Sequence, residues 1–199
     1  MNNVIKCQWS TKTELEEAYH DTEWGVPVFD DTLLFELLSL ELCQSGLSWH
    51  TILKKREGYR NAFEQFNIAK VAIYNDDHIA QLVTDENIVR HKAKITAIIN
   101  NAAAILKVQQ EFGSFSGYLW GFVNHQPIVN GWQQESEVPA STPLSDQISK
   151  DLKKRGFKFL GSTTVYAFLQ AVGIVNDHIQ TCFRFKPCCE AIPEDSPVS

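Results

Sequence analysis

The sequence contains no apolar run that could cross a membrane, no strand-like alternation and no internal repeat. Its longest apolar stretches fall well short of the ~18 residues that a membrane-spanning helix needs. The N-terminus, MNNVIKCQWS, has no basic start followed by an apolar stretch, so we expect no secretory signal. These absences predict a cytoplasmic protein that makes no contact with membranes.

A disulfide framework is also missing. The five cysteines are an odd number at irregular spacings, which favours reduced thiols over paired ones. The 199 residues are 44% hydrophobic and 21% charged, as in soluble globular proteins. This length fits one domain or two small lobes around a buried core.

Positive charge is scarce, and the formal net charge of −6 argues against indiscriminate nucleic-acid binding. Between Thr13 and Leu53 there are nine acidic residues and no Lys or Arg. Basic residues gather later, in residues 54–56, 90–94 and 150–158. They can form one basic face on an acidic protein, or each run can be an ordinary solvated helix face.

The hydrophobic pattern predicts an all-helical protein. A long helix over residues 92–110 ends at Gly113, and the last apolar helix covers residues 161–173. Residues 126–143 are rich in polar residues and Pro and predict a long loop, which can include an extended piece near residues 128–130. The expected helix N-caps are Thr13, Asp30 or Asp31, Ser48, Asn67, Asn75 and Ser145.

The segment ELCQSGLSW, residues 41–49, combines a carboxylate at a helix end with a small-residue turn, a Leu and a Trp. A carboxylate beside aromatic rings suits a pocket for a cationic heterocycle, because it compensates the charge while a ring provides a stacking face. The alternative is a plain helix end with a core Leu and Trp.

A second pattern lies at the two ends of the chain. Its members are Cys7, His20, His178 and Cys182. His178 and Cys182 are four residues apart, so one helical turn would place them on one face. Two thiolates and two imidazoles fill a tetrahedral zinc ion without leaving a position for a reacting water, which implies a structural role. The alternative is two buried thiols and two unrelated histidines, and Cys188 or Cys189 could compete as ligands.

A third pattern is the run LVTDENIVRHKAK, residues 82–94, between two helical stretches. A short helix, a tight turn and a helix with basic side chains can grip a DNA phosphate. Asn87 tolerates the left-handed conformation that we expect in this turn. An ordinary connection between packed helices is the alternative.

From about residue 7 to about residue 182, the chain resembles the DNA-3-methyladenine glycosylase I family of the helix-hairpin-helix glycosylase superfamily. The motifs that carry the resemblance are CQW (7–9), AYHDTEWGVP (18–27), ELCQSGLSW (41–49), ILKKR (52–56), IVRH (88–91), FVNH (122–125), KKRGFKF (153–159) and VNDH (175–178). The resemblance implies an all-α fold of two helical lobes, with a zinc site tying the N- and C-terminal segments. It implies one domain over residues 1–187, a helix-hairpin-helix region at about 76–110 and a flexible tail at 188–199.

The resemblance also implies a role for each matching residue. Glu41 and Tyr19 hydrogen-bond the excised base and are the catalytic pair. Trp49 stacks on the base, and Trp9 and Trp24 are aromatic neighbours that could equally be core residues. The implied DNA contacts are Gln44, Gly46, Leu47, Asn87, Arg90, Lys92 and Lys94, and the implied zinc ligands are Cys7, His20, His178 and Cys182.

The implied activity is hydrolysis of the N-glycosidic bond of 3-methyladenine in alkylated double-stranded DNA, after the base flips out of the helix. The resemblance implies a monofunctional glycosylase without lyase activity, and we expect a monomer. Two other functions stay open at this point: a non-catalytic helix-hairpin-helix module for damaged DNA, and a zinc hydrolase with the Cys/His set as its active site.

Several residues depart from the family pattern. Glu16 stands where better-known members carry an aromatic residue, and Leu42 and Cys43 replace smaller or amide residues. Asn87 and Ala93 stand where Gly is common in the hairpin. These departures concern the width of the pocket and the geometry of the turn, and they leave the proposed ligands and the Glu–Tyr–Trp set in place.

Overall fold

The structure, a computed structural model, describes residues 4–190 and is mainly helical. Its helices are α1 (Glu14–Thr22), α2 (Asp31–Gln44), α3 (Trp49–Ala62), α4 (Ile68–Ala72), α5 (Asp76–Leu82), α6 (Lys92–Phe112), α7 (Phe115–Gly121), α8 (Pro143–Lys154), α9 (Ser162–Ala171) and α10 (Phe185–Glu190). Short 3-10 helices are η1 (Gln8–Lys12), η2 (Glu64–Phe66) and η3 (Glu135–Glu137). Within residues 4–190, no helix has the length and apolarity of a membrane span.

Side-chain caps start the helices largely where the sequence predicts them. The confirmed caps, each accepting a backbone N–H of the first turn, are Thr13, Asp30, Ser48, Asn67 and Asn75. Ser145 is a wrong prediction, because Thr142 caps α8 and Pro143 occupies its first position. The fixed φ of proline suits that position, so the helix begins three residues earlier than expected.

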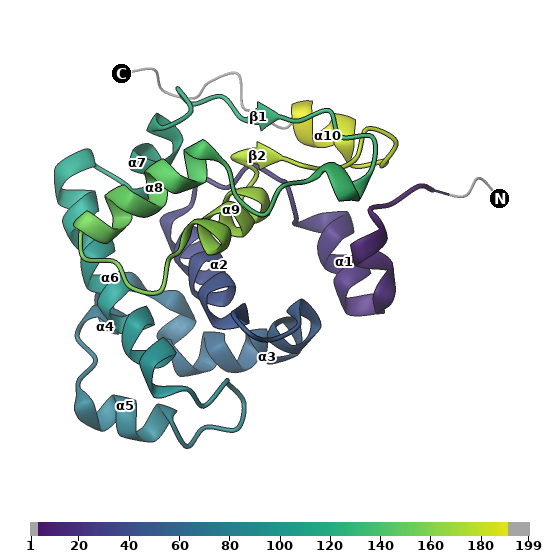
Figure 1. The fold of residues 1–199 in the computed structure, drawn as a ribbon. Coiled ribbons are helices and arrows are strands. Elements are labelled where there is room, and N and C mark those ends of the chain that lie inside the picture. Colours follow the sequence, from purple (N-terminus) through teal and green to yellow (C-terminus); the bar gives the residue numbers. More distant parts are fainter. Residues whose placement is uncertain (1–3, 191–199) are drawn as a thin grey trace.

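Helix α2 lies at the centre of the molecule. Its residues 34–43 are all buried. A helix that is apolar all round is packed on every side. Figure 1 shows why: α2 and α9 lie between α3 to α6 on one side and α1, β2 and α10 on the other, in agreement with the predicted two-lobed arrangement.

The two ends of the described chain meet. The backbone N–H of Phe183 donates to the carbonyl of Ile5, at 3.0 Å. Strand β1 (Ile128–Val129) pairs in parallel with β2 (Val175–Asn176), so the predicted extended piece in the loop is confirmed. Helix α10 was not predicted, and it continues three residues into the expected tail. The rest of that tail lies outside the described residues.

An ion-pair network with a buried centre, Glu36 and Arg56, joins α1, α2 and α3. Glu36 of α2 pairs with Arg56 and Arg60 of α3, and Arg56 also reaches Glu23 after the end of α1 at 2.8 Å. Removing one partner of a buried pair leaves an uncompensated charge, which is strongly destabilising. The network therefore fixes the relative positions of the three helices that surround the site.

Candidate active site

A cavity of about 650 Å³ opens where η1, α1, α2, α3 and α9 meet. It brings together the predicted base-binding residues, which the sequence spreads over 41 positions. Those that line it are Trp9, Tyr19, Trp24, Glu41, Gln44 and Trp49. The aromatic rings give the cavity flat apolar walls, which suit a planar heterocycle.

Glu41 lies in the last turn of α2 and is 7% exposed. No group of the described residues donates a hydrogen bond to its carboxylate. Burial raises the pKa of Glu41 to about 8, because the charged form loses its hydration. A buried acid without a partner is held ready for a ligand that carries positive charge or donates hydrogen bonds.

Tyr19 and Trp49 add two further polar atoms that have no partner. The Tyr19 hydroxyl and the Trp49 indole N–H are both buried without a hydrogen bond. Such groups are uncommon in folded proteins and point to a missing ligand. Burial and the nearby Glu41 raise the pKa of Tyr19 well above its usual value, so the hydroxyl stays a donor. The two ring centroids are 5.2 Å apart.

Four buried residues form a group that could hold a metal ion. The ligand atoms of Cys7, His20, His178 and Cys182 all lie within 4.8 Å of one another. His20 Nε2 and His178 Nδ1 each lie 3.5 Å from Cys182 Sγ. Hydrogen bonds from the Cys7 thiol and these imidazoles lower the pKa of Cys182, because they stabilise the thiolate.

The second nitrogen of each imidazole is already bound. His178 Nε2 lies 3.0 Å from the Trp24 carbonyl, and His20 Nδ1 lies 2.8 Å from Asp21 Oδ1. Outer partners of this kind orient metal-binding histidines. Gly25, whose φ is +79°, allows the approach, because a Cβ there would lie 2.9 Å from His178 Nε2. Cys188 and Cys189 are not members of this four-residue group.

The turn between α2 and α3 carries an exposed apolar side chain. Gly46 has φ +80°, and the neighbouring Leu47 is 40% exposed. Lys94 of α6 holds this turn, since its Nζ donates to the carbonyls of Cys43 at 2.9 Å and Ser45 at 2.6 Å. Lys94 is buried, which corrects its predicted role as a direct DNA contact. Its ammonium group stabilises the turn between α2 and α3 through these two hydrogen bonds.

The connection between α5 and α6 differs from the prediction in one respect. Asn87 is not among the residues with positive φ. Its backbone N–H and side-chain amide instead bind Asp85 Oδ1, at 2.8 and 2.9 Å. The turn therefore needs no glycine here, and Ala93 lies without difficulty in the first turn of α6. Arg90 and Lys92 are exposed beside it.

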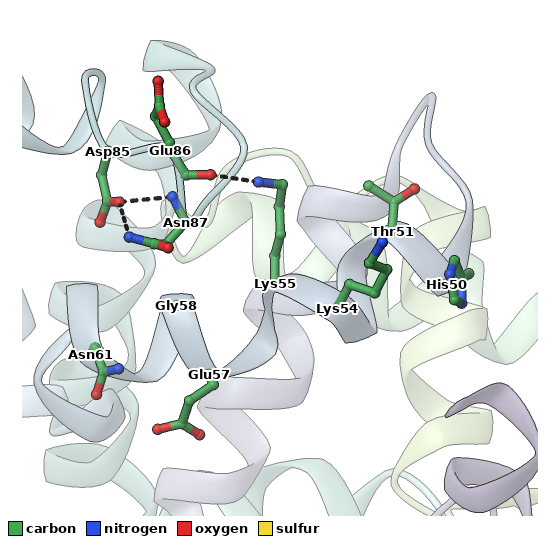
Figure 2. A pocket seen from close by; sticks show the side chains of 10 residues that line it. All are labelled: His50, Thr51, Lys54, Lys55, Glu57, Gly58, Asn61, Asp85, Glu86 and Asn87. Atoms are coloured by element: carbon green, nitrogen blue, oxygen red, sulfur yellow. Dashed lines mark hydrogen bonds between the residues drawn. The ribbon is translucent and has the colours of Figure 1, made fainter. Parts of the chain in front are cut away.

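Figure 2 shows a second cavity, of about 620 Å³, between α3 and this connection. Lys55 Nζ donates to the Glu86 carbonyl across it, at 2.6 Å. The connection packs closely on α3 at Gly58, where a Cβ would lie 2.3 Å from the Asn87 carbonyl. The glycine inside α3 is the sequence feature that indicates this close contact. The lining holds no aromatic ring other than His50, so a base fits the first cavity better.

Comparison with known proteins agrees with this geometry. A family model described as methyladenine glycosylase matches residues 9–185. The chain is 50% identical to DNA-3-methyladenine glycosylase 1 of Escherichia coli (strain K12), over 92% of the chain and 96% of the relative. It is 46% identical to a DNA-3-methyladenine glycosylase of Haemophilus influenzae, over 93% and 98%.

The chain belongs to the methyladenine glycosylase family.

Solved structures of the family superpose closely on this chain. A crystal structure of 3-methyladenine DNA glycosylase I has a TM-score of 0.87 at 47% identity, covering 90% of this chain and 98% of that one. A Staphylococcus aureus structure, described as showing the basis of 3-methyladenine recognition, has a TM-score of 0.88 at 43% identity over 90% and 96%.

Glu16 gives this methyladenine glycosylase an additional acid in the cavity. It is buried, and its carboxylate accepts a hydrogen bond from Thr13 Oγ1 at 2.9 Å. The departures at Leu42 and Cys43 are different, because both side chains are buried outside the cavity lining. They act on the packing of α2, so of the three only Glu16 changes the chemistry of the wall.

Asp177 also reaches the cavity, but its oxygens are occupied. They accept hydrogen bonds from Asn130 Nδ2, Trp132 Nε1, Gln170 Nε2 and the Tyr166 hydroxyl. Four donors leave no lone pair free to activate a water molecule. Asp177 therefore ties the long loop to α9, which places Glu135 and Val138 in the cavity wall.

Proposed function

We propose that Glu41, Tyr19 and Trp49 bind and release 3-methyladenine in this cavity, in a monofunctional glycosylase acting on alkylated double-stranded DNA. The observation that carries the proposal is the convergence on one aromatic cavity of two buried donors without partners, the Tyr19 hydroxyl and the Trp49 indole N–H, with the buried carboxylate of Glu41. Excision of 3-methyladenine is the activity of the family to which the chain belongs. A planar ligand with polar edges would bind Glu41 and Tyr19 through its edges while its ring stacks on Trp49.

The chemistry of the lesion matches this site. Methylation at N3 makes adenine formally cationic while it is attached to deoxyribose, and the base leaves as a neutral molecule. Little general-acid assistance is then needed. The protein must select the flipped base and favour the charge pattern of bond cleavage. Glu41 supplies the negative charge, Tyr19 one directed hydrogen bond, and Trp49 a stacking face.

On the DNA side, Leu47 is the side chain proposed to fill the space left by the flipped nucleotide, with Gly46 allowing the turn and Gln44 beside it. Apolar side chains act as wedges in this way. We assign Arg90, Lys92 and the backbone around Asn87 to one phosphate, in a helix-hairpin-helix arrangement of α5 and α6. The support is that both basic side chains are exposed at the start of α6.

The Cys/His group is proposed to hold a structural zinc ion. Zn–S and Zn–N bonds of about 2.3 and 2.05 Å at a tetrahedral angle require S···N separations of about 3.6 Å. The observed separations between cysteine sulfur and histidine nitrogen are 3.5, 3.5 and 3.7 Å. Four protein ligands leave no open position for a reacting water, which argues against a zinc hydrolase.

The remaining alternative is a non-catalytic module that binds damaged DNA. Nothing in the cavity favours it, because a surface that only grips DNA needs no buried carboxylate. Incubating the protein with alkylated DNA and separating the freed bases by chromatography tests the two against each other. We expect free 3-methyladenine, and an absence of released base from folded, DNA-binding protein would contradict the proposed function. We expect a monomeric cytoplasmic enzyme.

Replacing Tyr19 with Phe is expected to have opposite effects on activity and stability. Losing the directed hydrogen bond should slow release of 3-methyladenine by about tenfold. Removing a buried hydroxyl that has no partner should stabilise the free protein by about 1 kcal/mol. Single-turnover release and thermal unfolding without ligand measure the two effects.

The matched control is Tyr118→Phe. The Tyr118 hydroxyl donates to Asp151 Oδ2 at 2.7 Å and does not line the cavity. This variant should lose stability and keep its rate of base release. Equal release by the Tyr19 variant and the wild type would remove Tyr19 from the proposed site.

A further inference from the structure

The motif KKRGFKF, residues 153–159, has no role in the chemistry described above. It forms the end of α8 and the connection to α9. Phe159 in this connection has φ +59° and is 50% exposed. A left-handed aromatic residue is strained, and strain of this kind persists only where the surroundings impose it. Burial of the Phe159 ring does little to offset this strain, because the ring is exposed.

Hydrogen bonds from α6 hold the connection in this conformation. The Asn101 side chain donates to the Lys158 carbonyl at 3.1 Å and accepts from the Lys158 N–H at 2.8 Å. Asn100 donates to the Gly156 carbonyl at 2.7 Å. The buried side chains of Phe157 and Leu160 anchor the connection on both sides of the exposed residues. The fold thus holds the backbone on both sides of Phe159 in place.

Three exposed lysines precede the exposed ring in the same segment. Lys153, Lys154 and Lys158 are exposed, and none of them forms an ion pair with a residue in the range 4–190. Arg155, the other cation of the motif, is occupied by Glu111 and Asp151. An exposed aromatic ring together with unpaired lysines is a combination that nucleic-acid-binding surfaces use.

The segment between α8 and α9 is bound to α6, the helix that begins at the proposed DNA contacts. Figure 1 shows the segment between α8 and α9 running across the middle of α6. Lys92, Thr96 and Asn100 follow one another at four-residue steps on α6, so they lie on one face. Eight residues of α-helix span about 12 Å, which is the length of about four base pairs. Lys94 braces the Leu47 turn from this same half of α6.

We propose that Phe159, with Lys154 and Lys158, forms an additional contact to the DNA duplex beside the lesion. In this arrangement the ring packs against the base and sugar surface of the groove, and the two ammonium groups bind phosphates. The inference rests on the proposed function, because it extends the same DNA-binding face. It predicts an effect on binding of DNA and none on binding of the free base.

The test compares Phe159→Gly with Ile73→Ala, a matched control at an apolar side chain that is 79% exposed at the end of α4. Glycine removes the ring and relieves the positive φ, so the variant should be at least as stable as the wild type. Its affinity for a duplex with an abasic-site analogue should fall about tenfold. Affinity for free 3-methyladenine should not change. The control should match the wild type in all three measurements.

A second pair of variants tests the charges. Lys158→Gln should lower the slope of log affinity against log salt by about one, whereas Lys107→Gln, an exposed lysine farther along α6, should not. Wild-type-like DNA binding by both the Phe159 and Lys158 variants would overturn this inference. That result would not contradict the proposed function, because release of the base is measured separately. Wild-type protein that releases no base would instead contradict the proposed function.

Discussion

Replacing Glu41 with Gln is expected to slow the release of 3-methyladenine about 100-fold or more, with folding and metal content unchanged. The variant keeps the size of the side chain and removes its charge. A cationic base in the aromatic cavity then loses the negative charge that α2 places in the cavity wall. Single-turnover release from alkylated DNA measures the change, and full activity in the folded variant would refute the role of Glu41.

The pH dependence of the wild type provides an independent check. The pKa of Glu41 in the free protein is raised to about 8 by burial, and the ionised form is the one that matches the cationic base. The kcat/KM value reports the free enzyme, so it should rise with pH through about 8 and then level off. The Glu41→Gln variant should lack this rise. An identical profile in both proteins would exclude Glu41 as its source.

The contribution of Glu41 to the stability of the wild type should fall with increasing pH, whereas kcat/KM rises. The folded pKa of Glu41 lies above its ordinary value of 4.5, so between pH 4.5 and about 8 the folded protein keeps a proton that the unfolded chain has released. The contribution of Glu41 to stability is therefore complete below pH 4.5 and is lost as pH rises through about 8. Glutamine does not titrate. The free energy of unfolding of the Glu41→Gln variant should therefore increase relative to that of the wild type, by about 1 kcal/mol or more at pH 8. Thermal unfolding measures this difference.

Replacing Cys182 with Ser is the second change with a large expected effect. It removes one of the four proposed ligands, which come from the two ends of the described chain, so the metal should be lost and the melting temperature should fall by about 10 °C or more. The physical reason is that metal binding adds directly to folding stability when the unfolded chain has no preformed site. A chelator should lower the melting temperature of the wild type and leave that of the variant unchanged.

Cys189→Ser is the control for this experiment. Its thiol is partly exposed and lies outside the four-residue group, with Asn176 Nδ2 at 3.3 Å as a neighbour. This variant should keep its metal and most of its stability, which would also show that Cys189 does not compete for the ion. Elemental analysis of the purified wild type and variants measures their zinc content. Wild-type protein that contains no zinc would contradict the proposed site, whatever the stability of the Cys182 variant.

Local sequence signals predicted the helices well because they depend on neighbouring residues. Thr13, Ser48 and Asn75 cap the helices that they were expected to cap, since a cap needs only a side-chain oxygen two or three residues before a free N–H. The prediction of Ser145 as a cap was wrong because Thr142 and Pro143 provide a more favourable helix start three residues upstream. Helix α10 was missed because its six residues, FKPCCE, have no apolar periodicity.

The site was predicted less evenly. Residues of one motif, such as Glu41 and Trp49, share the cavity because a single turn joins their helices. Lys94 was misread as a phosphate contact, since a lysine in a basic run looks exposed until the fold gives its ammonium group two carbonyl acceptors. Asn87 was assigned a left-handed backbone that the turn does not use, because Asp85 closes it with a side chain.

The sequence by itself determined the helical class, most helix starts, the family and the residue types needed for chemistry, because these follow from short-range hydrogen bonding and from motifs read in order. Only the tertiary structure decided which polar groups lack partners. Whether Glu41 is unpaired, Asp177 saturated or Lys94 buried depends on contacts between residues far apart in the chain. Burial and hydrogen-bond satisfaction are properties of the packed core, and they distinguish a reactive carboxylate from a structural one.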